Sequence, residues 1–102
     1  MIKIVIEKDE QEIINSIKVN GHACSAEEGK DLVCAAVSAI MVGGANALKN
    51  KSDFEIILEK GNALIKKKKT GKCEDDKVML TIVTQLLTIE ESYSKFIKVQ
   101  IK

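Results

Sequence analysis

Two residues with reactive side chains, His22 and Cys34, lie twelve positions apart in a segment rich in small residues. His22 is the single histidine of the chain, and Gly21 and Ala23 flank it. A thiolate, not a thiol, attacks carbonyl carbon, and a neighbouring imidazole activates a cysteine by accepting its proton. The pair therefore has the chemistry of a thiolate–imidazole nucleophile.

Cys34 is predicted to lie near the start of a helix over residues 29–48, where unpaired N–H groups favour a thiolate and can hold an oxyanion. Asp31 and Ser38 lie three positions before it and four after it, so they share one helix face with it. Asp31 either orients the imidazole or complements the helix dipole. Ser38 either supports the local hydrogen bonds or is a small residue at a tight contact. Spacing alone also leaves open a buried packing cysteine and a surface histidine.

The cysteines permit two further interpretations. Cys24, Cys34 and Cys73 with His22 nominally supply four metal ligands, but the spacing contains neither a Cys-x2-Cys nor a His-x3–5-His pair. We therefore expect no metal. An odd number of cysteines without an export signal predicts thiols rather than disulfides. A thiol redox sensor that uses Cys24 and Cys34 is an alternative function.

Apolar periodicity places this segment within a small set of strands and helices. The expected strands cover residues 2–8, 12–20, 53–59, 63–69 and 95–102, and the expected helices cover 29–48 and 74–93. The order ββαββαβ predicts an α/β fold of the α+β type, with a mostly antiparallel sheet that carries both helices on one face. The length of 102 residues predicts a single domain over 1–102.

Composition narrows the classes of partner. The formal net charge is +1, whereas proteins that bind nucleic-acid phosphates usually carry a clear basic excess. The lysine run Lys66–Lys69 is interpreted as a solvated strand end or hairpin, or as a landing site for RNA or an acidic partner.

No apolar run is long enough for a signal peptide or a membrane span, so a cytoplasmic location without membrane contact is expected. Gly43 and Gly44 indicate close packing, either against the sheet of the domain or against a second copy.

The segment over residues 21–38 closely resembles the ribosomal-processing cysteine protease family, known as Prp. The family pattern is Gly-His-Ala followed about a dozen residues later by Gly-x-Asp-[Ile/Val/Leu]-Val-Cys-Ala-Ala-Val-Ser. Here it appears as Gly21-His22-Ala23 and Gly29-Lys30-Asp31-Leu32-Val33-Cys34-Ala35-Ala36-Val37-Ser38. The resemblance implies that His22 and Cys34 form a catalytic dyad that needs no cofactor.

The resemblance also implies a substrate, an assembly and a loop. The substrate is the N-terminal extension of large-subunit ribosomal protein number twenty-seven, and the active form is a homodimer. A loop that covers the site corresponds here to Ala23, Cys24, Ser25, Ala26, Glu27 and Glu28. Cys24 and the lysine run depart from what the resemblance explains. A non-catalytic module that binds the ribosome or RNA through these lysines is therefore the competing hypothesis.

Overall fold

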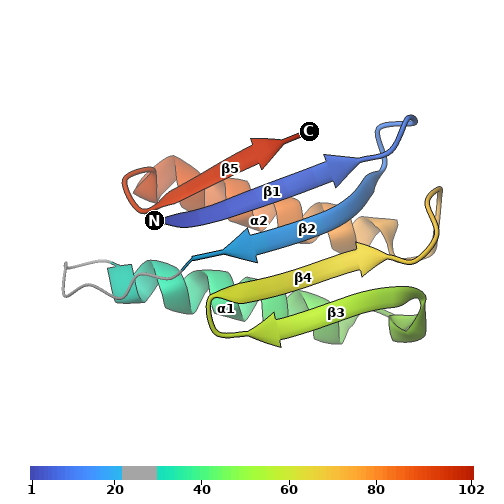
Figure 1. The fold of residues 1–102 in the computed structure, drawn as a ribbon, viewed down its shortest axis with the longest axis horizontal. Coiled ribbons are helices and arrows are strands. Elements are labelled where there is room, and N and C mark those ends of the chain that lie inside the picture. Colours follow the sequence, from blue (N-terminus) through green and yellow to red (C-terminus); the bar gives the residue numbers. More distant parts are fainter. Residues whose placement is uncertain (22–29) are drawn as a thin grey trace.

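The computed structural model describes residues 1–21 and 30–102, and at Lys30 and Asp31 it describes the backbone alone. The described elements follow the predicted order ββαββαβ, and a short 3-10 turn precedes the third strand (Figure 1). Their bounds are β1 (Ile2–Lys8), β2 (Ile14–Asn20), α1 (Lys30–Ala47), η1 (Lys51–Asp53), β3 (Phe54–Glu59), β4 (Asn62–Lys67), α2 (Asp76–Tyr93) and β5 (Ile97–Ile101).

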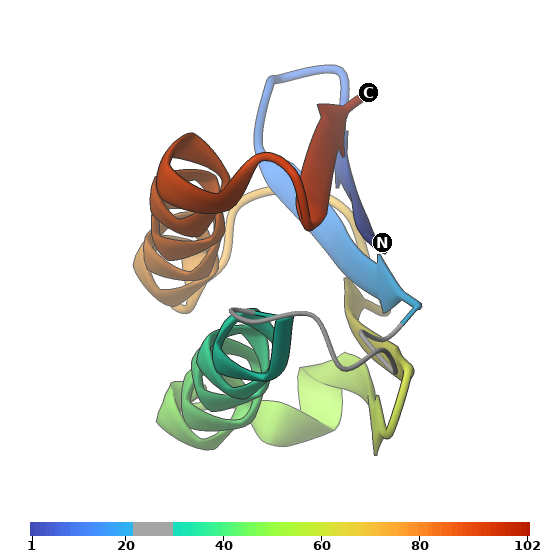
Figure 2. The same ribbon diagram turned by 90° about the vertical axis from the view of Figure 1, so that its left-hand side faces the viewer.

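The elements form two layers, with α1 and α2 side by side on one face of a five-stranded sheet (Figure 2). The strand order is β3-β4-β2-β1-β5. The pair β1–β5 is parallel, because α2 carries the chain across the sheet before β5, and the other pairs are antiparallel. This confirms the predicted α+β class and the mostly antiparallel sheet.

Strand alternation sends isoleucines toward the helices and polar side chains toward the opposite face. Ile4 and Ile6 of β1 are buried opposite Val19 and Ile17 of β2. Lys18, one position before Val19, is exposed on the uncovered face. The core therefore lies between the sheet and the helix layer, as period-two burial requires.

The two helices approach each other closely at a glycine. A Cβ atom at Gly44 would overlap the side chain of Ile82 on α2, whereas a Cβ atom at Gly43 would meet nothing within 4 Å. Ile82 is buried, so the small residue at position 44 serves the contact between α1 and α2. The predicted partners of this glycine pair were the sheet or a second copy, whereas in the structure Gly44 packs against α2. Within the described residues, neither helix is long and apolar enough to cross a membrane.

Candidate active site

Cys34 is the fifth residue of α1, so it lies within the first turns of that helix as predicted. Its side chain is half-buried and packs against the core that Val33 and Val37 help to form. The helix start also provides backbone N–H groups without an intrahelical acceptor. Cys34 therefore lies about one turn after the backbone donors at the start of α1, which are of the kind that can hold an oxyanion.

The helical periodicity of α1 defines the side of the helix on which Cys34 lies. Val33 and Val37 are buried against the sheet. Cys34 comes one position after Val33, and Ser38 comes one position after Val37, so Cys34 and Ser38 lie on the same flank of α1. Ile40, on the opposite flank, lines the groove between α1 and α2. Cys34 and Ser38 therefore face away from α2, and Ser38 is exposed. The predicted common face is confirmed for these two residues, whereas the side chain of Asp31 is not described.

His22 and the predicted substrate loop, Ala23, Cys24, Ser25, Ala26, Glu27 and Glu28, lie outside the described residues. The segments that flank them are described: β2 ends at Asn20, Gly21 follows, and α1 begins at Lys30. Both flanking segments lie at the same end of the molecule (Figures 1 and 2). The chain therefore leaves the sheet just before His22 and re-enters the helix layer just before Cys34.

Cys73 lies at the other end of the molecule, in the connection that leads from β4 to α2. The neighbouring residue Glu74 contacts Lys49, just beyond the end of α1. That end of the helix lies about 20 Å from Cys34 along the helix axis. The four nominal metal ligands of the sequence are therefore not brought together. Among the described residues, no group of three or more metal-ligating side chains lies close enough to hold an ion.

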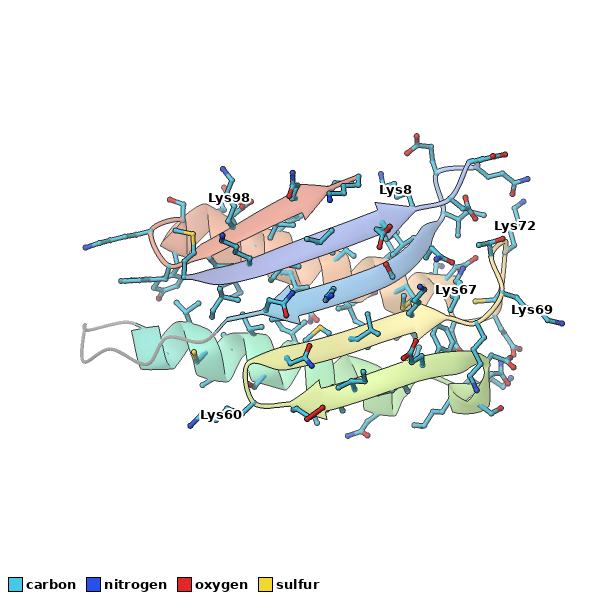
Figure 3. The ribbon with its side chains drawn as sticks, viewed as in Figure 1. Lys8, Lys60, Lys67, Lys69, Lys72 and Lys98 are labelled. Carbon is cyan, nitrogen blue, oxygen red and sulfur yellow. The ribbon has the colours of Figure 1, made fainter. Side chains whose placement is uncertain are left out.

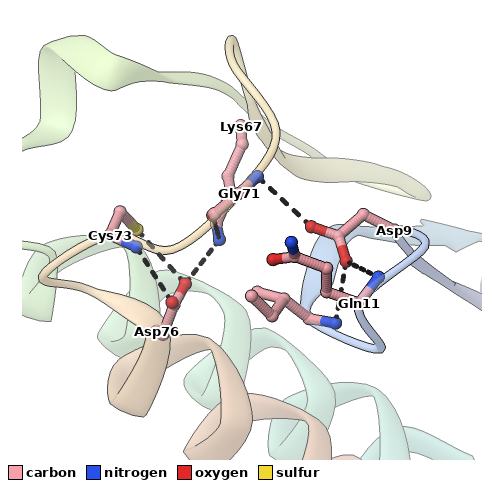
Figure 4. A network of polar contacts seen from close by, with 7 residues as sticks. Asp9, Gln11, Lys67, Gly71, Cys73 and Asp76 are labelled. Carbon is pink, nitrogen blue, oxygen red and sulfur yellow. Dashed lines mark hydrogen bonds and ion pairs between the residues drawn. The ribbon is translucent and has the colours of Figure 1, made fainter.

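Polar side chains gather at this second end in what we call the far-end cluster, formed by Asp9, Lys67, Gly71, Cys73 and Asp76 (Figure 4). The Lys67 ammonium donates to the Gly71 carbonyl at 2.8 Å and contacts the Asp76 carboxylate directly. The Cys73 N–H donates to Asp76 at 2.9 Å, and the Gly71 N–H donates to Asp9 at 3.2 Å. The cluster thus ties the β1–β2 turn, the end of β4 and the start of α2 together.

The far-end cluster shifts the titration of its own acids. Burial alone raises the pKa of the Asp76 carboxyl, but hydrogen bonds from Lys67 and Cys73 outweigh it and hold this pKa below its ordinary value. A hydrogen bond from the Ile13 N–H is the largest cause that lowers the pKa of Asp9. Burial, followed by the hydrogen bond to Asp76, raises the pKa of the Cys73 thiol. Cys73 is therefore kept as a neutral thiol, which is a poor nucleophile.

The lysine run does not form the fully solvated patch that the sequence predicted. Lys67 is only 4% exposed, because it lies two positions after Ile65 and therefore on the same inner face of β4. Its ammonium contacts Asp76 within the far-end cluster. Lys66, Lys68 and Lys69 are exposed, and Figure 3 shows Lys69 projecting from the same end of the molecule. The prediction was wrong for Lys67, although the period-two pattern of β4 contained the signal that would have turned it inward.

The chain is similar over its whole length to known cysteine proteases. A curated relative from Staphylococcus aureus, named ribosomal processing cysteine protease Prp, is 29% identical over the full length of both chains. The crystal structure of the Staphylococcus aureus protease Prp in complex with a substrate peptide matches with a TM-score of 0.87, at 28% identity over all of both chains. A second structure of that protease, with a covalently linked product peptide, matches with a TM-score of 0.84 at 29% identity over all of both chains.

These likenesses and the two-layer fold define a cysteine protease. The family model described as cysteine protease Prp matches residues 1–98 of this chain. The chain belongs to that family, which confirms the resemblance carried by residues 21–38.

Proposed function

We propose that this protease removes the N-terminal extension of large-subunit ribosomal protein number twenty-seven, with Cys34 as the nucleophile and His22 as the base. His22 takes the thiol proton, and the Cys34 sulfur attacks the scissile carbonyl to form a tetrahedral oxyanion. Backbone N–H groups at the start of α1 stabilise this oxyanion. Collapse expels the new N-terminal amine, which receives the proton from His22, and leaves the extension as a thioester. Water, deprotonated by His22, then hydrolyses the thioester.

The observation that carries the proposal is the position of Cys34 in the first turns of α1, at the end of the molecule where the chain leads into and out of the His22 segment. A covalently linked product in a relative's structure is what a thioester route leaves behind. The name of that relative specifies ribosomal processing, and its other structure holds a substrate peptide. We therefore propose a peptide segment of a ribosomal protein as the class of substrate for this chain.

The direct test is cleavage of the extended ribosomal protein, with the new terminus read by mass spectrometry. We expect one cut by the wild type and none by Cys34→Ala or His22→Ala. Cys73→Ala is the matched control, because Cys73 lies at the far end and its thiol is held neutral. It should cut at the wild-type rate. Cleavage retained by Cys34→Ala contradicts the nucleophile, and no cleavage by folded wild type contradicts the substrate.

The thioester offers a second, independent readout. Slowing deacylation by rapid acid quench should trap a species whose mass equals the enzyme plus the removed extension minus one water. This adduct should map to the peptide that contains Cys34 after proteolytic digestion. Cys34→Ser, which retains a weaker oxygen nucleophile, should give at most a trace of the adduct. An adduct at Cys73 contradicts the assignment.

We further propose that the chain is a homodimer that associates through the outer face of the helix layer. From Leu32 to Ala47, where the side chains of α1 are described, the residues that point away from the core are all uncharged, although 30% of the chain is charged. Leu32 and Val42 on this face are 60% and 43% exposed. The outer threonines of α2 turn their hydroxyl donors back to their own helix; these are Thr81, Thr84 and Thr88. A largely uncharged surface such as that of α1 is typical of subunit contacts.

Charge reversal on this face tests the dimer. Light scattering after gel filtration should give twice the chain mass for the wild type and the single chain mass for Val42→Glu. Lys18→Glu, on the uncovered face of the sheet, is the matched control and should stay dimeric. Val42→Glu that remains dimeric excludes this face, and a monomeric wild type excludes the dimer.

The remaining parts of the proposal follow from the same chemistry. The reaction needs water and protein groups alone, so we assign no cofactor. We place the enzyme in the cytoplasm, because its proposed substrate is a protein of the ribosomes that assemble there. The net charge of +1 and the internal use of Lys67 argue against nucleic acid as a direct ligand. A filter-binding assay with ribosomal RNA at moderate salt should therefore detect no tight complex.

A further inference from the structure

Gly21 is the residue at which the chain leaves β2 and turns toward His22. Its φ angle is 92°, in the region that residues with a side chain rarely adopt. The residue before it, Asn20, still pairs with Asn62 of β4 and Lys3 of β1. The direction in which the backbone departs from the sheet is therefore set at this one position.

The space around Gly21 is closed by the backbone of β1. A Cβ atom at this position would lie 2.5 Å from the Met1 carbonyl oxygen and 3.7 Å from the Ile2 Cα. Backbone atoms cannot move aside as a flexible side chain can, because Ile2 is buried and paired with β5. Position 21 thus excludes a side chain on two separate grounds, its φ angle and its contact with Met1.

A hydrogen bond fixes Gly21 from the other side. Its N–H donates to the Gly61 carbonyl at 3.1 Å, within the turn that joins β3 to β4. Gly61 itself has a φ of 77° and makes that tight turn possible. Gly21 is therefore held between the start of β1 and the β3–β4 turn, two segments that are far from it in sequence.

We infer that Gly21 is a positioning residue for catalysis: it sets the point and direction from which the chain enters the base His22. The inference rests on the proposed dyad. A general base works within hydrogen-bond reach of the group it deprotonates, and a displacement of about 1 Å costs on the order of a hundredfold in rate. A change in the backbone direction at Gly21 is passed on to the following residue through one planar peptide unit. Gly21 thereby couples the register of three strands to the geometry of the thiolate–imidazole pair.

The first test substitutes Gly21→Ala and uses Gly71→Ala as the matched control. Gly71 has a φ of 102° but no atom within 4 Å of an added Cβ, and it lies in the far-end cluster. Both variants suffer the penalty of a positive φ, and Gly21→Ala adds the contact with Met1. Melting temperatures report this strain, whereas kcat reports the position of the catalytic groups. We expect Gly21→Ala to lose at least about tenfold in kcat with KM within about threefold. Gly71→Ala should keep the wild-type kcat.

The second test keeps Gly21 and its contacts and inserts one extra glycine between Gly21 and His22. This variant folds even if Gly21→Ala does not, because the insertion lies beyond the last strand pair of β2. We expect loss of kcat at an unchanged melting temperature. An extra glycine after Gly71 is the control and should leave kcat unchanged.

The pH dependence of Cys34 alkylation by iodoacetamide separates positioning from general damage. If the imidazole has moved away, the alkylation rate should rise with pH along the titration curve of an ordinary thiol, whose pKa is about 8.5. Wild type and both position-71 variants should instead share one profile. A wild-type kcat and alkylation profile in both position-21 variants overturns the inference. Full activity of His22→Ala in the same assay overturns the dyad itself, so the two failures are distinguishable.

Discussion

The Lys67 ammonium contacts the Asp76 carboxylate at the end of the molecule opposite the start of α1. The Lys67 side chain is 3% exposed and that of Asp76 is 30% exposed, so the pair lies at the margin of the core. A cation so little exposed requires a partner, because its desolvation is otherwise uncompensated. The contact fixes the end of β4 against the first turn of α2.

Replacing Lys67 should destabilise the fold without affecting the chemistry at Cys34. Lys67→Met leaves the Asp76 carboxylate without its cation, and we expect a loss of about 2–3 kcal/mol in the free energy of unfolding. Lys69→Met, on an exposed side chain, should change it by less than about 0.5 kcal/mol. Urea titration measures both. The double variant Lys67→Met with Asp76→Leu should recover part of the loss, and strict additivity of the two single losses contradicts a direct pairing.

The stability of the chain should fall at acid pH through Asp9 and Asp76. Both carboxyls have pKa values in the folded chain below their ordinary value of 3.8. The unfolded chain therefore takes up protons at higher pH than the folded chain does, so this contribution is full above about pH 5 and is lost as the pH falls below about 4. Urea titrations between pH 7 and pH 3 should show this decline. Asp76→Asn should show a shallower decline, and an unchanged slope contradicts the assignment.

The neighbouring glycines of α1 should respond oppositely to alanine. Gly43→Ala adds a methyl group in open space and should stabilise the helix by up to about 1 kcal/mol. Gly44→Ala drives the methyl group into Ile82 and should be less stable than Gly43→Ala by about 1–3 kcal/mol. Thermal unfolding compares the two. Ile82→Val removes the overlapping Cδ1 and should relieve part of the Gly44→Ala loss; equal stability of the two glycine variants contradicts the close contact.

Local pattern predicted the order of the elements, because each helix and strand carries its own period of apolar residues. The position of Cys34 near the start of α1 was predictable for the same reason: Cys34 follows Val33 in a helical stripe, and the motif over residues 21–38 is contiguous in sequence. The parallel pairing of β1 with β5 depends on contacts between residues about 95 positions apart, such as Ile2 and Ile97. Local periodicity carries no information about such partners.

The far-end cluster escaped prediction for a related reason. A run of four lysines is read as a charged, solvated segment. Strand alternation turns Lys67 inward, but this becomes evident only when Ile65 is known to face the core. The acceptors of the inward Lys67, Gly71 and Asp76, belong to the following loop and helix. Gly21 belongs to a sequence motif, but its closed surroundings depend on Met1 and Gly61, at distant points of the chain.

Asp75 should stabilise the connection between the helices by accepting from the backbone. Its carboxylate, which is 3% exposed, accepts from the Lys49 N–H at 2.8 Å and from the Asn50 N–H at 2.9 Å. Asp75→Ala leaves two amides without an acceptor, and we expect a loss of about 2–4 kcal/mol. Glu74→Gln, on an exposed side chain next to it, should cost less than about 1 kcal/mol. Hydrogen exchange of the Lys49 and Asn50 amides should quicken in Asp75→Ala alone, and unchanged protection contradicts this role.

Substitutions of Asp31 and Ser38, the two residues expected to support the proposed dyad, should differ in their effect on kcat. Ser38 is exposed on the flank of α1 that carries Cys34, one turn further from the helix start, so Ser38→Ala should keep kcat within about twofold. Asp31 belongs to the first turn of α1, where it either orients His22 or complements the helix dipole. We expect Asp31→Asn to lower kcat by about tenfold or more at a nearly constant melting temperature, because loss of a charge that orients the imidazole affects catalysis more than folding. Steady-state kinetics and thermal unfolding of the same preparations decide the matter. A lowered melting temperature with wild-type kcat assigns Asp31 to the helix dipole and leaves the dyad without a third member at this position.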